Sequence, residues 1–284
     1  MPFVSPTARR RILITGETGA GKTRCIRTFP GPKMVLVCPG EFGQDTLLKT
    51  DGTPLDDDTK VIVWESDPEK PQTSTAIIDE FRKMLFGIVR GKEGPVHTLA
   101  IDGIHKLYEY MMDAKSGGEY FAGSPFKTES RNDSQVVDPR VSAQAEHLLM
   151  DTLSIVHLSR IPIVLVTIWD KGTGIRKAKV QADGSKEKWQ DIPQHNMPAL
   201  YSAASRKILG QFGVCLYAKA ETKKVEKEVN GRKAWVSERQ FVWQTQPDNE
   251  VGACAVKADD GKVIDIPKFV RADWRELAKY LEQG

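Results

Sequence analysis

The chain has 284 residues, of which 40% are hydrophobic and 28% charged, and its formal net charge is +3. This length allows one large domain or two small ones, and the composition excludes a disordered, fibrous or disulfide-stapled protein. No apolar run approaches the ~20 residues that a helix needs to cross a bilayer. The N-terminus lacks a signal-peptide-like apolar stretch, and the four cysteines are scattered, so we expect a cytoplasmic protein with no membrane association.

Short, β-branched apolar runs alternate with helical patterns over the first 170 residues. Predicted strands cover residues 11–15, 34–38, 61–64, 97–101 and 161–168. Predicted helices cover residues 22–29, 74–90, the segment after Asp102 through Met112, and 142–160. This alternation predicts an α/β fold whose mostly parallel sheet is flanked by helices.

The pattern changes after Asp170. The dipeptides Asp183-Gly184 and Asn230-Gly231 are typical of tight hairpin turns, and each lies within an alternating segment. The predicted elements here are hairpins over 175–192 and 223–236, strands over 214–218, 239–245 and 251–256, and helices over 198–212 and from about Asp273, where Asp273 and Glu276 fit a capping box. We expect one domain over 1–284, with a core at 11–220 and an extension of β-hairpins and a C-terminal helix at 221–284.

A phosphate-binding loop follows the first predicted strand. Gly16 to Thr23 match the pattern GxxxxGK[ST] between a strand and a helix. The glycines let backbone N–H groups surround phosphate oxygens, and the helix N-terminus adds its positive dipole end. The residues expected to bind ATP are Gly16, Glu17, Thr18, Gly19, Ala20, Gly21, Lys22, Thr23 and Arg24. We expect the Lys22 side chain to face solvent or ligand and to contact the β- and γ-phosphates.

Further polar residues lie at the ends of the other predicted strands. Thr23 and Asp102 are expected to hold Mg²⁺, although Asp102 could instead cap the following helix. Glu41 and Glu65 are both candidates for the acid that activates water, and Glu41 is preferred. Thr167 is a candidate sensor of the γ-phosphate. Each acid could equally be an ordinary exposed loop residue.

The order of these features resembles the RecA-core ATPases, and among them the small phage-encoded proteins of single-strand annealing and recombination. The resemblance rests on the loop ending in Lys22-Thr23, the segments Val35–Gly43, Thr98–Tyr108 and Ile163–Trp169, and Ala255-Val-Lys257-Ala-Asp259. It implies a RecA-like core in which Glu41 activates water and Thr167 lies near the sensor position. It also implies that Lys257 enters the ATP site of a neighbouring subunit, that the protein forms homo-oligomers with shared ATP sites, and that it works in the host cytoplasm with single-stranded DNA and a single-strand-binding protein.

Charge is distributed unevenly along the chain. Residues 171–239 contain 15 Lys/Arg and 7 Asp/Glu, a balance of +8, so the remaining residues carry −5. This predicts a surface that faces a polyanion, with Arg176, Lys177 and Lys179 as the expected DNA contacts. A solvated lysine-rich hairpin would give the same charge pattern. Two other functions stay open: a motor or regulatory ATPase acting on a protein or in DNA packaging, and a small-molecule kinase with Arg176 on its lid.

Overall fold

A computed structural model describes most of the chain. The described residues are 9–41, 43–64, 72–118, 138–170, 175–180, 188–193, 198, 200, 202–229, 232–248, 251, 254–257 and 264–282. Glu65, one of the two candidate acids, lies outside them. No helix within these ranges is long and apolar enough to span a bilayer.

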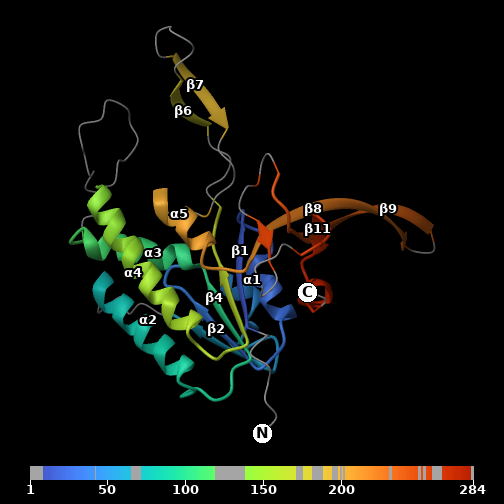
Figure 1. The fold of residues 1–284 in the computed structure, drawn as a ribbon. Coiled ribbons are helices and arrows are strands. Elements are labelled where there is room, and N and C mark those ends of the chain that lie inside the picture. The colour runs from blue at the N-terminus through green and yellow to red at the C-terminus, as the bar shows by residue number, and fades with distance from the viewer. Residues whose placement is uncertain are drawn as a thin grey trace.

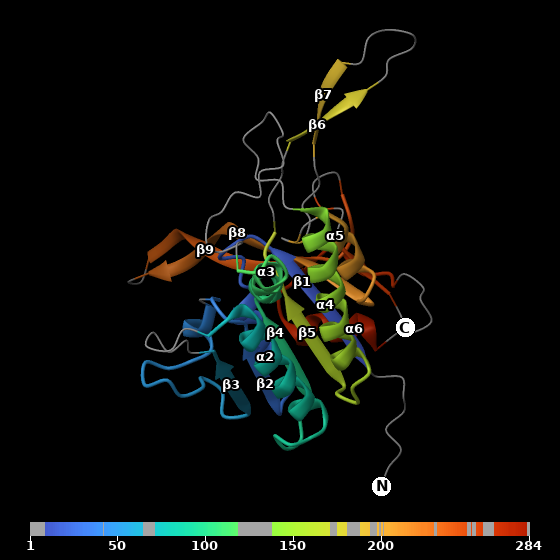
Figure 2. The same cartoon turned by 90° about the vertical axis from the view of Figure 1, so that its left-hand side faces the viewer.

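A parallel sheet forms the centre of the molecule (Figures 1 and 2). In spatial order its parallel strands are β8 (Val214–Val229), β1 (Arg10–Gly16), β5 (Ile163–Thr167), β4 (Thr98–Asp102), β2 (Lys33–Val37) and β3 (Thr59–Val63). The predicted order of strands along the chain is confirmed, and the fold class is the expected α/β one, with a mostly parallel sheet flanked by helices and a phosphate-binding loop (P-loop) after β1. Because β5 lies between β1 and β4, the P-loop and Asp102 are not on adjacent strands.

Both faces of this sheet are covered, because successive residues of β1 are buried in different core clusters. Leu13 belongs to one core cluster, packed against the long helices, whereas Ile12 and Ile14 belong to the cluster on the opposite face. The first face carries α2 (Ser74–Val89), α3 (Ile104–Lys115), α4 (Pro139–His157) and α5 (Ser202–Leu209). The second carries α1 (Lys22–Cys25), the 3-10 turn η2 (Ile26–Thr28) and α6 (Trp274–Leu281). Since the inner strands are buried on both faces, their central residues are mostly apolar, and most of their polar residues lie at the strand ends.

A long antiparallel ribbon extends from one side of the sheet (Figure 1). β8 pairs with β1 from Val214 to Ala218 and then continues alone with β9 (Arg232–Gln244), whose last register pair is Val229 with Arg232. The two-residue connection predicted at Asn230-Gly231 is therefore consistent with the pairing, although those two residues are outside the described ranges. The predicted boundaries of the strands at 214–218 and 239–245 are wrong, because the first is continuous with β8 and the second with β9, the two arms of the hairpin. The predicted division at residue 220 lies within β8.

The remaining elements are short or lie apart from the sheet. β6 (Ile175–Val180) and β7 (Lys188–Pro193) form the first predicted hairpin as a separate two-stranded sheet. β10 (Ala255–Val256) and β11 (Phe269–Arg271) pair with β8 and β9, and η3 (Gly43–Thr46) follows β2. The Asp273 carboxylate accepts a hydrogen bond from Arg275 N and so caps α6, but the Glu276 carboxylate pairs with Lys279. The reciprocal half of the predicted capping box is therefore wrong.

Candidate functional site

The P-loop leaves the carboxyl end of β1 through glycines with positive φ. Gly19 has φ +76° and Gly21 has φ +83°, conformations that L-residues rarely adopt. Lys22 follows at the start of α1, and its Nζ donates hydrogen bonds of 2.7 Å to the carbonyls of Gly16 and Glu17. Of the two expected environments of Lys22, solvent is wrong, because the side chain is folded back over its own loop and is only 7% exposed; its contact with a ligand stays a prediction.

The environment of Lys22 is acidic as well as buried. Burial lowers the pKa of its ammonium group, and the charges of Asp102 and Glu41 oppose that shift. An ammonium group held among carbonyls and carboxylates in a low-dielectric site retains a strong attraction for an incoming anion. The loop is therefore suited to exchange its carbonyl contacts with Lys22 for contacts between Lys22 and a phosphate group.

Asp102 lies opposite the loop and contacts both candidate threonines. Thr23 Oγ1 donates to Asp102 Oδ2 over 2.8 Å, and Thr167 Oγ1 donates to Asp102 Oδ1. Gly103, not Asp102, occupies the N-cap position of α3, so the helix-capping alternative is wrong. Burial raises the pKa of the Asp102 carboxyl, and the hydrogen bonds from the two threonines oppose this. Thr167 also accepts a hydrogen bond from Gly103 N over 2.9 Å, so it orients the acid from behind.

The Thr23–Asp102 pair suits a hard cation. A hydroxyl and a carboxylate are the oxygen ligands that Mg²⁺ prefers, with water or phosphate completing its coordination. Gly43 borders the pair, and a Cβ at this residue would lie 2.6 Å from Thr23 Oγ1 and 3.2 Å from Asp102 Oδ2. A side chain at residue 43 would therefore collide with these two oxygen atoms, and glycine avoids this. The residues present thus fit a magnesium ion.

Glu41 reaches the same edge from β2. After Val37, which pairs in register with Asp102, the chain turns at Cys38–Glu41, where Glu41 N donates to Cys38 O. The Glu41 side chain is 8% exposed, and a Cβ on Gly103 would lie 2.4 Å from Glu41 Oε2. The carboxylate of Glu41 therefore fills the space beside Asp102 that a side chain at residue 103 would otherwise occupy.

The β9 strand also contacts the P-loop, which the sequence did not predict. Arg239 Nη2 donates to Gly19 O over 2.8 Å. A Cβ on Gly21 would lie 2.5 Å from Phe241 Cδ1, and the guanidinium carbons of Arg24 and Arg239 lie 5.4 and 5.5 Å from the centre of the Phe241 ring. In the sequence, this segment stands out only by its basic and aromatic residues, and such a composition does not predict a contact with Gly19, 220 residues earlier.

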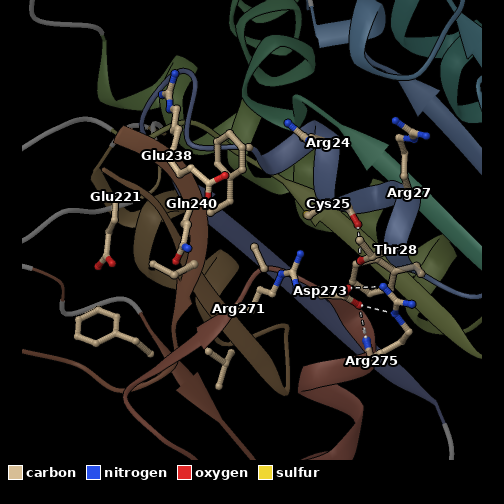
Figure 3. Close-up of a pocket in the computed structure, with 18 of the residues that line it drawn as sticks. Arg24, Cys25, Arg27, Thr28, Glu221, Glu238, Gln240, Arg271, Asp273 and Arg275 are labelled. Atoms are coloured by element: carbon tan, nitrogen blue, oxygen red, sulfur yellow. Dashed lines mark hydrogen bonds and ion pairs between the residues drawn. The ribbon is translucent and has the colours of Figure 1, made fainter. Parts of the chain in front are cut away.

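A groove of about 1410 Å³ lies between the first turn of α1 and the ribbon, with β11 and α6 at its end (Figure 3). Four of its cations form ion pairs within the groove, namely Arg27 with Asp56, Lys33 with Asp58, Lys223 with Glu221, and Arg275 with Asp273. In the described part of the chain, neither Arg24 nor Arg239 lies within ion-pair distance of a carboxylate. Arg24 and Arg239 thus place positive charge where the groove meets the P-loop.

The other predicted site residues lie away from this edge or are only partly described. Lys257 is exposed, and its N–H donates to Gly213 O near the amino end of β8, whereas the P-loop lies at the carboxyl end of β1. Arg176, Lys177 and Lys179 are on β6, and their side chains are outside the description. The structure therefore brings together Lys22, Thr23, Glu41, Asp102 and Thr167, and leaves Lys257 outside the site of its own chain.

No known family model matches the chain, and no curated protein matches its sequence. Among solved structures, the chain is similar to the flagellar accessory protein FlaH from Methanocaldococcus jannaschii, with 9% identity, a TM-score of 0.35, and coverage of 83% of this chain and 76% of FlaH. It is also similar to the assembled ATPase EscN of the enteropathogenic E. coli type III secretion system, with 13% identity, a TM-score of 0.37, and coverage of 75% of this chain and 43% of EscN. The assignment to an α/β fold with a P-loop rests on this chain's own strand order and loop sequence.

Proposed function

We propose that this protein is a Mg²⁺-dependent ATPase that acts on single-stranded DNA in phage recombination, annealing or replication. The observation that carries the ATPase part is the meeting of four side chains at one sheet edge: Lys22 of the P-loop, Thr23, Asp102 and Glu41. Phosphoryl transfer needs mainly positioning and charge stabilisation, and these groups supply both.

Each residue has a distinct role in the proposed hydrolysis. The backbone N–H groups of the P-loop and Lys22 bind the β- and γ-phosphates, and Thr23 and Asp102 hold the magnesium ion. That ion would neutralise charge on the phosphate oxygens. Glu41 accepts a proton from water as the water oxygen bonds to the γ-phosphorus, while the bond from that phosphorus to the β–γ bridging oxygen breaks. The products are ADP and inorganic phosphate.

Charge distribution supports DNA as the partner. Residues 171–239 carry the balance of +8, and Arg176, Lys177 and Lys179 lie on a hairpin that follows the end of β5, where Thr167 contacts Asp102. Trp235 on the ribbon is 71% exposed, which suits stacking on an unpaired base. A single-strand-binding protein is a further proposed partner, on the resemblance alone.

The deciding experiment measures ATP turnover with and without single-stranded DNA, alongside the mass in solution. We expect stimulation by DNA, and no turnover in Lys22→Ala. Turnover that persists in Lys22→Ala would contradict the ATPase assignment. ATP turnover that is unchanged by single-stranded DNA would instead favour an ATPase acting on a protein partner or in DNA packaging. Formation of a phosphorylated small molecule would favour a kinase.

The DNA site is tested separately through salt. For single strands, log affinity falls against log salt with a slope of about −0.7 per phosphate neutralised. Replacing Arg176, Lys177 and Lys179 together with Ala should weaken binding to all sequences and flatten this slope, while DNA-independent turnover stays unchanged. Salt-insensitive binding, or unchanged binding by the triple variant, would contradict the proposed contacts.

A further inference from the structure

A buried histidine lies behind the proposed water-activating acid. His105, on the first turn of α3, is 2% exposed, and neither of its ring nitrogens makes a hydrogen bond within the described residues. Its Nε2 lies 3.5 Å from Glu41 Oε2. A buried polar group without a hydrogen bond costs free energy, typically about 1–3 kcal/mol, so its position calls for an explanation.

His105 is held in this place by Trp169. The two rings are stacked, with centroids 4.3 Å apart and planes inclined by 30°. Lys106, the next residue of α3 after His105, has its Nζ 5.2 Å from the centre of the Trp169 ring. Burial, followed by the charges of Lys106 and Lys22, lowers the pKa of His105 to about 3. The imidazole is therefore neutral near pH 7 and can donate one hydrogen bond to a carboxylate without forming an ion pair.

Trp169 belongs to the strand end that already contacts the metal ligands. Thr167, two residues earlier, contacts Asp102. The backbone of residues 168–170 stays beside β1, because Ile168 N donates a hydrogen bond to Ile14 O and Asp170 N donates one to Gly16 O. The end of β5 thus supports two acids: Thr167 contacts Asp102 directly, and Trp169 supports Glu41 through His105. The β6–β7 hairpin follows directly after this strand end.

We propose that His105 is a positioning residue for Glu41: its Nε2–H hydrogen-bonds Glu41 Oε2 in the reactive state and leaves Oε1 to accept the proton from water, with Trp169 fixing the imidazole. This inference rests on the proposed ATPase function and assigns a role that the P-loop motif does not contain. The two atoms are 3.5 Å apart, and a shift of a few tenths of an ångström would bring them to hydrogen-bond distance. Fixing one carboxylate oxygen restricts the rotation of Glu41 and raises the fraction of time in a productive geometry.

The test compares His105→Leu, His105→Gln and the matched control His157→Leu. His157 also lies beside an aromatic ring, with its ring centroid 5.2 Å from that of Phe212. Its Nε2 is buried and makes no hydrogen bond within the described residues. It differs from His105 in its position, at the end of α4, where no contact with Glu41 is found among the described residues. We expect His105→Leu to lower kcat for ATP about 10-fold or more with KM unchanged. His105→Gln, whose amide can donate near the Nε2 position, should recover part of kcat, and His157→Leu should leave kcat unchanged.

A double-mutant cycle with Glu41→Gln separates positioning from a structural effect. If His105 acts through Glu41, the double variant should be no slower than Glu41→Gln alone. Additive losses, equal effects of His105→Leu and His157→Leu, or a KM change in place of a kcat change would overturn the inference while leaving the ATPase proposal intact. If Glu41→Gln itself retains full activity, the assignment of Glu41 fails, and the role of His105 fails with it. Melting temperatures of all variants verify that each protein is folded.

Discussion

At the scale of single residues, the site depends on glycines that make room for the groups beside them. Gly103 and Gly43 both adjoin functional oxygens, at Glu41 Oε2 and Thr23 Oγ1 respectively. Gly103 follows Asp102 directly, so the sequence places no acid next to Asp102 on its C-terminal side. In the fold, the absence of a side chain at Gly103 leaves room for the carboxylate of Glu41, which follows β2.

The role of Glu41 is tested by Glu41→Gln, with Glu65→Gln as the comparison. An amide can orient water but cannot accept its proton, and general-base catalysis contributes typically 10²–10⁴-fold. We expect Glu41→Gln to bind ATP normally and to lose hydrolysis within that range, measured as single-turnover release of phosphate. A severe loss in Glu65→Gln with an active Glu41→Gln would reverse the assignment.

The space at Gly103 is tested by Gly103→Ala against Gly91→Ala. Both glycines have similar φ, +79° and +75°, but nothing lies within 4 Å of a Cβ at Gly91. The backbone cost of this φ, about 1–2 kcal/mol in the free energy of unfolding, should therefore appear in both variants. Only Gly103→Ala displaces Glu41, so we expect a larger destabilisation and a loss of kcat in that variant alone. Equal denaturation midpoints and equal kcat in the two variants would show that a Cβ at residue 103 does not displace the Glu41 side chain.

At the scale of elements, the ribbon and the P-loop form one contact network. Phe241 packs against Gly21, and Arg239 donates to the Gly19 carbonyl, so the base of β9 holds the loop that would bind phosphate. The outer part of the ribbon carries the exposed Trp235.

The contact between β9 and the P-loop is tested by Arg239→Gln, with Lys224→Gln as the control. Arg239 fixes the Gly19 peptide and supplies a cation beside the phosphate site, whereas Lys224 is exposed on β8. A hydrogen bond to a charged group contributes about 1.5–3 kcal/mol, so we expect the affinity for ATP to fall about tenfold or more in Arg239→Gln. Calorimetric titration with ATP and Mg²⁺ in the absence of DNA measures this. Equal affinities in the two variants would mean that the arginine serves the loop's structure only.

At the scale of the whole molecule, Lys257 cannot act at the P-loop of its own chain. It lies beside Gly213, and the strand from Ile12 to Gly16 separates that end of the sheet from the loop. At about 3.3 Å per residue the separation is about 13 Å, which is longer than a lysine side chain. A catalytic role for Lys257 therefore requires a second copy of the chain.

Mixing two inactive proteins tests that role. Lys22→Ala lacks a functional P-loop and Lys257→Ala lacks the proposed cation, so a mixed assembly would contain some sites with both groups intact. We expect partial recovery of ATP turnover on mixing, increasing with protein concentration. A protein that stays monomeric at assay concentrations, or a Lys257→Ala variant with full activity by itself, would exclude the shared site.

The sequence by itself determined the features that depend on neighbouring residues. The P-loop is a continuous eight-residue pattern, and each central strand is a short apolar run, so Lys22, Thr23, the strand order along the chain and the Asn230-Gly231 connection could all be predicted. Asp102 could be predicted because it ends an apolar strand. These signals are local, and local backbone preferences and hydrophobic patterning are sufficient to produce them.

Only the tertiary structure decided which distant groups meet at this edge. Glu41 lies beside Gly103 because β2 and β4 pair in the register of Val37 with Asp102, and no local pattern encodes that register. The same holds for Trp169 stacked on His105 and for Arg239 at Gly19. The physical reason is that parallel strands align their carboxyl ends whatever their separation in the chain. The identity of the groups that meet there is therefore a property of the assembled sheet.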